Sequence, residues 1–288
     1  MLKKLTSVLL IVIASMQLQA QQEKSLLWEI SGNGLQRSSY IFGTIHIIKK
    51  KDFFLTEAIR DKLKHSQVFI TEVDMNIPLV QQLQLAKSMY LPNNKTLQDY
   101  ISPEDFNIFS RIVKDSMGLS NSKFDKYIRV KPFFTGSLLI KQMMGKIKAY
   151  ESELYKIAKN SGIPSDGLET IKFQMSLVDA TPLKEQAALL VSDVKNFRQT
   201  MASYNKMVEI YKQQDLEQLY TMVVSDSTTD SEFNETFIYK RNTSWIPIIE
   251  KKIKEYSCFI AVGGAHLPGV NGILVLLRKQ GYTVTPIK

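Results

Sequence analysis

The chain has 288 residues, of which 44% are hydrophobic and 23% charged, so it has enough apolar sequence for the core of one large domain or two small ones. Its formal net charge is +9, and loss of a leader holding Lys3 and Lys4 would leave +7, which favours contact with anionic surfaces. The sequence contains no long basic run and no nucleic-acid-binding module, so we expect no nucleic-acid partner and interpret the charge mainly as a solvated face. Association with a membrane surface stays open.

Residues 1–20 have the features of a secretory signal. A basic start precedes the apolar run 8–14, and Leu18-Gln-Ala20 is a suitable cleavage site. The apolar run is too short for a stable spanning helix, although an uncleaved signal would tether the protein to the membrane. We therefore predict an exported protein, periplasmic or secreted, whose single domain spans 21–288.

The mature chain opens with a predicted β-hairpin. Residues 26–31 alternate in polarity, 32–34 form a Gly-Asn-Gly turn signal, and 39–44 form the returning strand. This second strand runs through Gly43 and presents His46 two residues after it ends. A histidine placed at the rim of a sheet in this way is a candidate functional residue.

The same pattern recurs near the C-terminus. A predicted strand over 258–262 leads into Gly263 and then His266, so two of the three histidines follow a strand in the pattern G-x-x-H. Glycine at that position lets backbone or substrate approach closely. The strand also holds Cys258, the only cysteine, which excludes an internal disulfide. The two copies suggest an old duplication.

Strands are predicted at the two ends of the chain and helices between them. The strand over 67–74 ends in Glu72 and Asp74, which alternation places on one face. Residues 78–255 are mostly helical, with a short strand or loop over 165–170 that presents Glu169. The predicted fold class is α/β, with a sheet built by the terminal segments and a large helical insertion over about 78–255.

Helix-capping residues mark several helix starts. Thr56 could cap a helix within 55–65, Ser102 followed by Pro103 starts another, and Asp215 caps a third. The aromatic stripe from Phe197 to Tyr211 has helical spacing and is typical of core packing.

Two histidines with nearby carboxylates are a common ligand set for a divalent transition metal. An open position on such a metal lowers the pKa of a bound water to about 7, and a free carboxylate then serves as general base. An arginine can hold an anionic substrate group or a developing oxyanion. The candidates for these roles are His46, His266, Glu72, Glu169 and Arg241, with Asp74 as a reserve.

Each candidate also has a structural interpretation. A histidine at a strand end is often only hydrogen-bonded, and neither copy has a local metal signature such as H-E-x-x-H. Glu72 and Asp74 could face solvent, Glu169 could cap the helix that follows it, and a helical Arg241 could be a surface charge.

Several motifs, taken in order, resemble the TraB/GumN family. They are Leu27-Trp-Glu-Ile, Tyr40-Ile-Phe-Gly-Thr-Ile-His46, Lys131-Pro132, Gly167-Leu-Glu-Thr170 with Gln174, Arg241-Asn242 with Trp245, Val262-Gly-Gly-Ala-His-Leu-Pro-Gly269 and Gly281-Tyr-Thr-Val284. Each motif is weak alone, but together they are specific and cover nearly all of the mature chain.

This family is grouped with the Tiki-type metalloproteases and, more distantly, with erythromycin-esterase-like proteins. The resemblance implies an α/β fold with a helical insert and a site made of His46, His266 and Glu72. Glu169 and Arg241 match further family positions. Val73 stands where the family often has Leu, which changes packing and not chemistry.

The first functional hypothesis is an exported metal-dependent hydrolase, a peptidase in the first instance, acting on a peptide or small-molecule substrate. Mn, Co or Zn would be held by His46 and His266 with Glu72 or Glu169; the remaining glutamate would activate water and Arg241 would orient substrate. The alternative is a non-catalytic peptide-binding or signal-sequestering protein with the same fold. A role in surface-polysaccharide production is suggested only by the GumN name.

Overall fold

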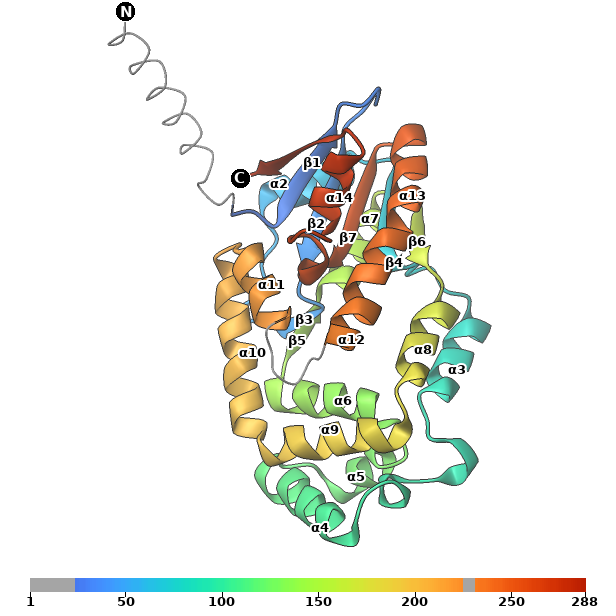
Figure 1. The fold of residues 1–288 in the computed structure, drawn as a ribbon, viewed down its shortest axis with the longest axis vertical. Coiled ribbons are helices and arrows are strands. Elements are labelled where there is room, and N and C mark those ends of the chain that lie inside the picture. The colour runs from blue at the N-terminus through green and yellow to red at the C-terminus, as the bar shows by residue number, and fades with distance from the viewer. Residues whose placement is uncertain (1–23, 225–230) are drawn as a thin grey trace, which may run out of the picture.

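The structure is a computed structural model that describes residues 24–224 and 231–288. The predicted signal, residues 1–20, lies outside the described residues. Figure 1 shows a sheet with its helices at one end of the molecule and a helical part at the other. No helix within the described ranges has the length and apolarity needed to cross a membrane.

Within the described residues the main sheet has six strands, in the order β6-β4-β7-β2-β1-β8. Their bounds are β1 Leu27–Ser31, β2 Ser39–Thr44, β4 Val68–Val73, β6 Ser165–Glu169, β7 Cys258–Gly263 and β8 Thr283–Ile287. β1 pairs antiparallel with β2 and with β8, as the predicted hairpin requires for the first pair. The central strand β7 is buried along its whole length, which explains its continuous apolar sequence.

Four neighbouring strands run in the same direction. β6 pairs with β4, β4 with β7, and β7 with β2, each time in parallel. Their carboxyl ends therefore lie at one edge of the sheet, which is where open α/β sheets bind ligands. Glu72, Glu169, Gly263 and Thr44 stand at or next to those ends.

Helices cover both faces of this sheet. The pair α2 (Glu57–Lys64) and α7 (Tyr150–Asn160) lies behind it in Figure 1, and the pair α13 (Lys240–Glu255) and α14 (Ile273–Lys279) lies in front. The core between the layers is apolar and includes the fully buried Trp245 and Phe259. Burial of this area is the main stabilising contribution to the fold.

The helical part has a smaller core of its own, which includes Phe109, Phe124 and Leu190. The helices of the middle region are α3 Leu79–Ser88, α4 Pro103–Arg111, α5 Asn121–Tyr127, α6 Pro132–Met144, α8 Ile171–Ala180, α9 Leu183–Lys195, α10 Phe197–Lys212, α11 Leu216–Val224 and α12 Ser231–Asn234. The buried side chains of α10 and α11 pack into the core of the sheet part. A two-stranded ladder of β3 (Ile47–Lys49) and β5 (Ile147–Ala149) begins next to His46. This ladder was not predicted, because three-residue strands carry too little periodicity to be recognised.

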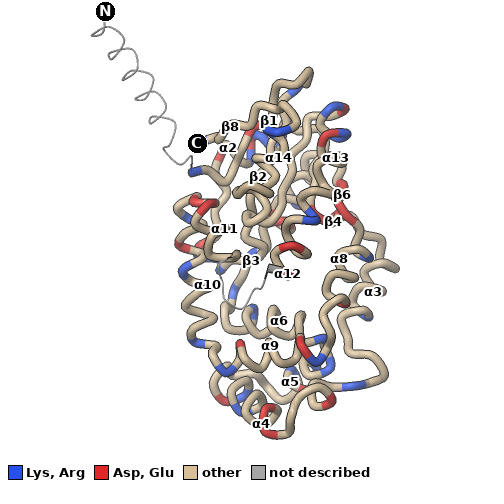
Figure 2. The backbone as a smooth tube through the Cα atoms, in the orientation of Figure 1, with Lys and Arg blue, Asp and Glu red and all other residues tan. Residues whose placement is uncertain are grey.

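The predicted fold class is confirmed, with strands at both termini and helices between them. One strand of the main sheet, β6, comes from within the mostly helical middle region and pairs with β4. The capping predictions are also confirmed: the side chains of Thr56, Ser102 and Asp215 accept hydrogen bonds from the first turns of α2, α4 and α11. Figure 2 shows basic and acidic residues interspersed over both parts of the molecule.

Gly43 is required by the close approach of the two G-x-x-H segments. A Cβ at this position would lie 3.0 Å from Leu267 Cδ1 and 3.1 Å from the backbone of Gly264. We expect Gly43→Ala to lower the free energy of unfolding in urea by about 1–3 kcal/mol, since a packed core resists added atoms. The control is Gly136→Ala in α6, where the nearest atom would be Leu190 Cδ1 at 3.8 Å. Helix propensity should make that variant more stable, by up to about 1 kcal/mol, and equal effects at both glycines would contradict the packing argument.

Candidate functional site

The two G-x-x-H segments meet because their strands are neighbours. In the β2–β7 ladder Gly43 pairs with Val262 and Thr44 pairs with Gly263, so both chains leave the sheet at the same level. A Cβ on Gly263 would lie 3.4 Å from His46 Nε2, 3.4 Å from Glu72 Oε1 and 3.5 Å from His266 Cδ2. The Cα of Gly263 thus forms the floor beneath three of the predicted site residues, and its missing side chain leaves the space between them open.

His46 lies at the open side of this group, with 64% of its side chain exposed. Its Nδ1 is 3.0 Å from Oε1 of Glu151, which also accepts a 2.6 Å hydrogen bond from Thr44 Oγ1. Because a carboxylate only accepts, Nδ1 carries the proton. The other ring nitrogen, Nε2, faces Gly263 and Glu72, and its lone pair becomes available once the ring is neutral.

His266 lies at the buried side, 6% exposed, and its tautomer follows from its neighbours. Asn242 Nδ2 donates to the backbone oxygens of His266 and Asn271, so Asn242 Oδ1 is the atom that faces His266 Nδ1 at 2.6 Å. Nδ1 therefore carries the proton, and Nε2 is an acceptor. Arg241 Nη1 donates to this Nε2 at 3.3 Å.

Arg241 joins two buried glutamates from neighbouring strands. Its Nη2 donates to Glu72 Oε2 at 2.5 Å and to Glu169 Oε1 at 2.7 Å, and its Nε donates to Glu169 Oε2 at 3.1 Å. Nη1 also donates to the carbonyl of Phe237, one turn earlier in the chain. The guanidinium is 6% exposed, so every one of its nitrogens has a partner inside the protein.

Glu169 has four donors, which leaves little capacity for another role. Besides the two bonds from Arg241, Trp245 Nε1 donates to it at 3.1 Å and Gln174 Nε2 at 3.2 Å. The Trp245 ring also stacks under the guanidinium, 4.6 Å from its central carbon, and lies 4.7 Å from the His266 ring. Glu169 is therefore best suited to holding Arg241 in place.

The surroundings set the charge of each group. Burial lowers the pKa of His266 to about 3, with help from the positive charge of Arg241, so this ring is neutral at neutral pH. The carboxylate of Glu151 raises the pKa of His46 to about 9. Burial opposes the charge of Glu72, but His266, His46, Arg241 and the amide of Gly263 stabilise it and hold its pKa at about 2.

The donor atoms fit a metal in type and orientation, but Arg241 Nη1 occupies the lone pair of His266 Nε2. Both histidines direct Nε2 inward while Nδ1 donates to a fixed oxygen, of Glu151 or Asn242, which is how metal-binding histidines are usually held. Glu72 Oε1 lies 3.9 Å from His266 Nε2. As arranged, no three His, Cys, Asp or Glu side chains of the described residues are grouped closely enough to hold an ion. Metal binding therefore requires that Arg241 Nη1 gives up its contact with His266 Nε2.

The structure thus brings His46, His266, Glu72, Glu169 and Arg241 into one cluster. Glu72 and Arg241 are buried, and the cap of α8 is Thr170, not Glu169. The reserve candidate Asp74 is elsewhere: its carboxylate accepts hydrogen bonds from Ser165 and from the backbone of Asn76.

Sequence reasoning did not assign roles to Glu151 and Asn242. On α13, Asn242 and Trp245 lie on the same buried face as Ile249 and Ile253, at helical spacings of three and four residues. This periodicity would have predicted that the Asn242 amide is buried. Glu151 had no such signal, since it lies in the first turn of a surface helix and meets His46 only through the β3–β5 ladder.

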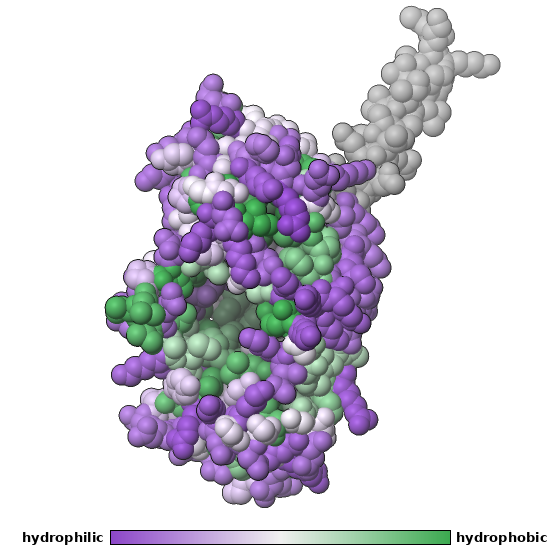
Figure 3. Space-filling model, turned by 180° about the vertical axis from the view of Figure 1, so that it is seen from behind, coloured by the Kyte–Doolittle hydropathy of each residue, from purple (hydrophilic) through white to green (hydrophobic). Residues whose placement is uncertain are grey.

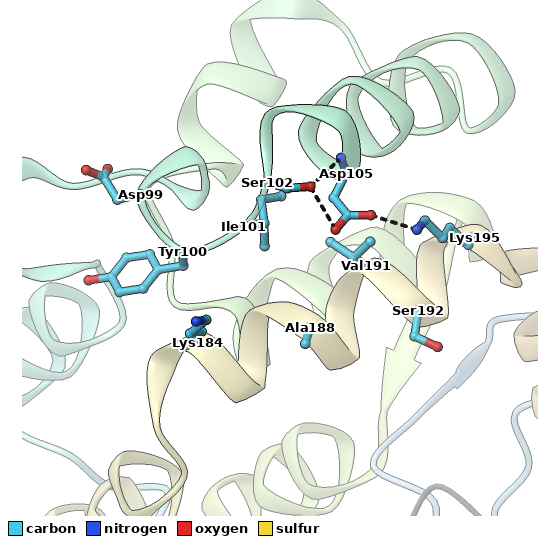
Figure 4. A pocket seen from close by; sticks show the side chains of 10 residues that line it. All are labelled: Asp99, Tyr100, Ile101, Ser102, Asp105, Lys184, Ala188, Val191, Ser192 and Lys195. Carbon is cyan, nitrogen blue, oxygen red and sulfur yellow. Dashed lines mark hydrogen bonds and ion pairs between the residues drawn. The ribbon is translucent and has the colours of Figure 1, made fainter.

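A cavity of about 740 Å³ lies in the helical part, away from this cluster. Figure 4 shows it between the start of α4 and α9, where Asp105 accepts hydrogen bonds from Ser102 and Lys195. None of the clustered residues lines it. Two of its charged groups, Asp105 and Lys195, are paired with each other, so it gives no reason to move the candidate site.

A comparison with protein families agrees with the resemblance that the motifs suggested. The family model described as the TraB/PrgY/gumN family matches residues 26–286. The chain belongs to this family. No curated protein and no solved structure matches it. The matched range runs from β1 to β8, so in this TraB/PrgY/gumN protein it includes every strand that contributes to the cluster.

Glu151 controls the charge of His46, and we expect Glu151→Gln to lower the His46 pKa from about 9 toward 6.5. NMR titration of the ring protons, assigned with His46→Ala, measures this. The raised pKa stabilises the folded state fully below pH 6.5, and this contribution is lost as the pH rises through about 9. Solvent screening of the exposed ring keeps the contribution small. Glu151→Gln should remove this part of the pH dependence of stability. The control is Glu153→Gln, whose carboxylate pairs with Lys148 and Lys156. An unchanged His46 titration in Glu151→Gln would contradict this account.

Proposed function

We propose that this protein is an exported metal-dependent hydrolase and that peptides are its first candidate substrates. The observation that carries the proposal is the convergence of His46 Nε2, Glu72 Oε1 and the His266 ring around Gly263. The export part rests on the signal-like sequence of residues 1–20 alone.

His46 and His266 would hold the metal through Nε2, with Glu72 beside them. A divalent Mn, Co or Zn ion bound there would lower the pKa of a coordinated water. Glu151 and Asn242 keep the two rings oriented and their Nδ1 atoms protonated, which leaves Nε2 as the donor.

Arg241 and Glu72 would act on the substrate and the water. Opening the contact between Arg241 Nη1 and His266 frees one guanidinium edge, while the bonds of Nε and Nη2 to Glu169 keep the group in place. That edge is suited to a carbonyl oxygen that gains negative charge. Glu72 is the carboxylate that lies between the inward-facing sides of both histidine rings, so it is the candidate for accepting a proton from water or for completing the ligand set.

One observation favours the alternative of a binding protein that does not cut. Arg241 is bonded to both glutamates and to His266 at once, which leaves the cluster internally paired. In such a protein the same edge of the sheet would hold a peptide without a metal. Metal content therefore separates the two functions.

The first test is the metal content of the mature protein after dialysis against limiting Mn, Co and Zn. We expect close to one ion per chain in the wild type and loss of the ion in His46→Ala and in His266→Ala, because each removes a nitrogen donor. His65→Ala is the matched control, since His65 caps α2 and bonds to Asp61. Circular dichroism checks that the variants are folded. A wild-type protein that takes up none of the three ions would refute the hydrolase and leave the binding protein.

The second test separates the two roles of Glu72. Glu72→Gln keeps the shape of the side chain and removes its charge. If Glu72 accepts the proton, peptide hydrolysis should fall by about 10²–10⁴-fold while the metal is retained. If Glu72 is a ligand, metal and activity should disappear together. A Glu72→Gln protein with wild-type turnover would show that this carboxylate has neither role.

A further inference from the structure

A second cavity, of about 350 Å³, lies between α8, α9 and the segment that leads into α13. Its apolar lining consists of Leu177, Ala180, Pro182, Leu189, Phe233 and Phe237. We call it the aromatic pocket. Figure 3 shows hydrophobic surface lining a hollow between the sheet part and the helical part of the molecule. The volume is at the lower end of the range of ligand pockets, which suits one side chain and the adjoining backbone.

The aromatic pocket and the candidate site share the same elements. Phe237 lines the pocket, and its carbonyl accepts a 3.0 Å hydrogen bond from Arg241 Nη1. On α8, Gln174 donates to Glu169 at 3.2 Å, and Leu177, one turn further, lines the pocket. Two separate helical segments therefore each carry one residue of the site and one wall of the pocket.

The lining is aromatic and incompletely covered. Phe237 stacks on Phe233, with ring centroids 4.5 Å apart and planes 22° apart, and on Phe133, at 6.2 Å and 14°. Leu189, in the lining, and Phe133, which packs on Phe237 without lining the pocket, remain 47% and 42% exposed. Large apolar side chains gathered around a hollow and left in water are typical of a surface that a ligand covers.

Charge narrows the choice of ligand. The pocket also includes Glu185 and Glu232, and no basic residue among those that the structure describes lines it. Carboxylates there disfavour an acidic ligand and favour a neutral or cationic one. An aromatic or branched aliphatic side chain in an otherwise uncharged or basic peptide satisfies both the apolar walls and the acidic rim.

We propose that the aromatic pocket binds an apolar side chain of a peptide and so positions the adjoining peptide bond near Arg241. The proposal rests on the proposed hydrolase function for its consequence in catalysis, but the binding step needs no metal and no reaction.

The experiment uses hexapeptides Ala-Ala-Xaa-Ala-Ala-Lys labelled with fluorescein on the lysine, with Phe, Leu, Ser or Asp at Xaa. Fluorescence anisotropy in EDTA measures binding without cleavage. We expect Phe and Leu peptides to bind about ten- to hundred-fold more tightly than the Asp peptide, since burial of a large apolar side chain is favourable. Leu189→Asp should remove most of this preference, and Leu189→Lys should improve binding of the Asp peptide.

The matched control is Leu83→Asp on α3, which is 63% exposed and does not line the pocket, and it should keep the wild-type preference. Equal binding of the four peptides, or a preference that survives Leu189→Asp, would overturn the pocket proposal. With metal restored, selective binding without hydrolysis would refute the hydrolase and leave the pocket standing. Hydrolysis without side-chain selectivity would refute the pocket proposal and leave the hydrolase proposal standing.

Discussion

The buried guanidinium of Arg241 is the interaction on which the site depends. It ties Glu72 at the end of β4 and Glu169 at the end of β6 to helix α13, and so fixes two strands and a covering helix relative to one another. Two carboxylates this close and this buried would repel each other and lose hydration without it. Removal of the guanidinium would leave Glu169 with only the neutral donors Gln174 and Trp245. In the folded protein the five donors of the guanidinium are all directed to oxygens or to His266 Nε2.

One guanidinium for two carboxylates leaves the interior of the site negative. The positive charge nearest to it is that of His46, which Glu151 stabilises from the open side. A metal cation that replaced the proton on His46 Nε2 would therefore bind where the surrounding carboxylates already stabilise a positive charge. The neutral His266 ring, fixed by Asn242, would offer it a nitrogen without a proton to displace. These electrostatic features support the proposed metal function more than the presence of two histidines does.

Local sequence patterns predicted the strands of the main sheet and the caps, and they singled out the five residues that the structure brings into one cluster, because alternation, capping side chains and G-x-x-H are short-range signals. Convergence is different. His46 and His266 meet because β2 and β7 are parallel neighbours, and Glu169 joins them because β6 pairs with β4 from the middle of the chain. Strand order is a long-range property that residue spacing does not encode, and the motif resemblance implied the grouping without its geometry. Glu151 escaped prediction for the same reason.

In our proposal, the sheet part of the molecule carries the chemistry and the helical part carries the recognition of the peptide. The strand ends supply His46, Glu72, Glu169 and Gly263, and strands hold such groups more rigidly than loops do. The helical middle region supplies the aromatic pocket, whose walls come from α8, α9 and the start of the segment before α13. In our proposal, changes in the middle region alter which peptide is held while the donors at the sheet edge stay in place. α8 and α13 are the elements that would connect the pocket to the sheet edge. α8 begins just after Glu169 and continues along the pocket, and α13 begins beside Arg241 and continues along the sheet.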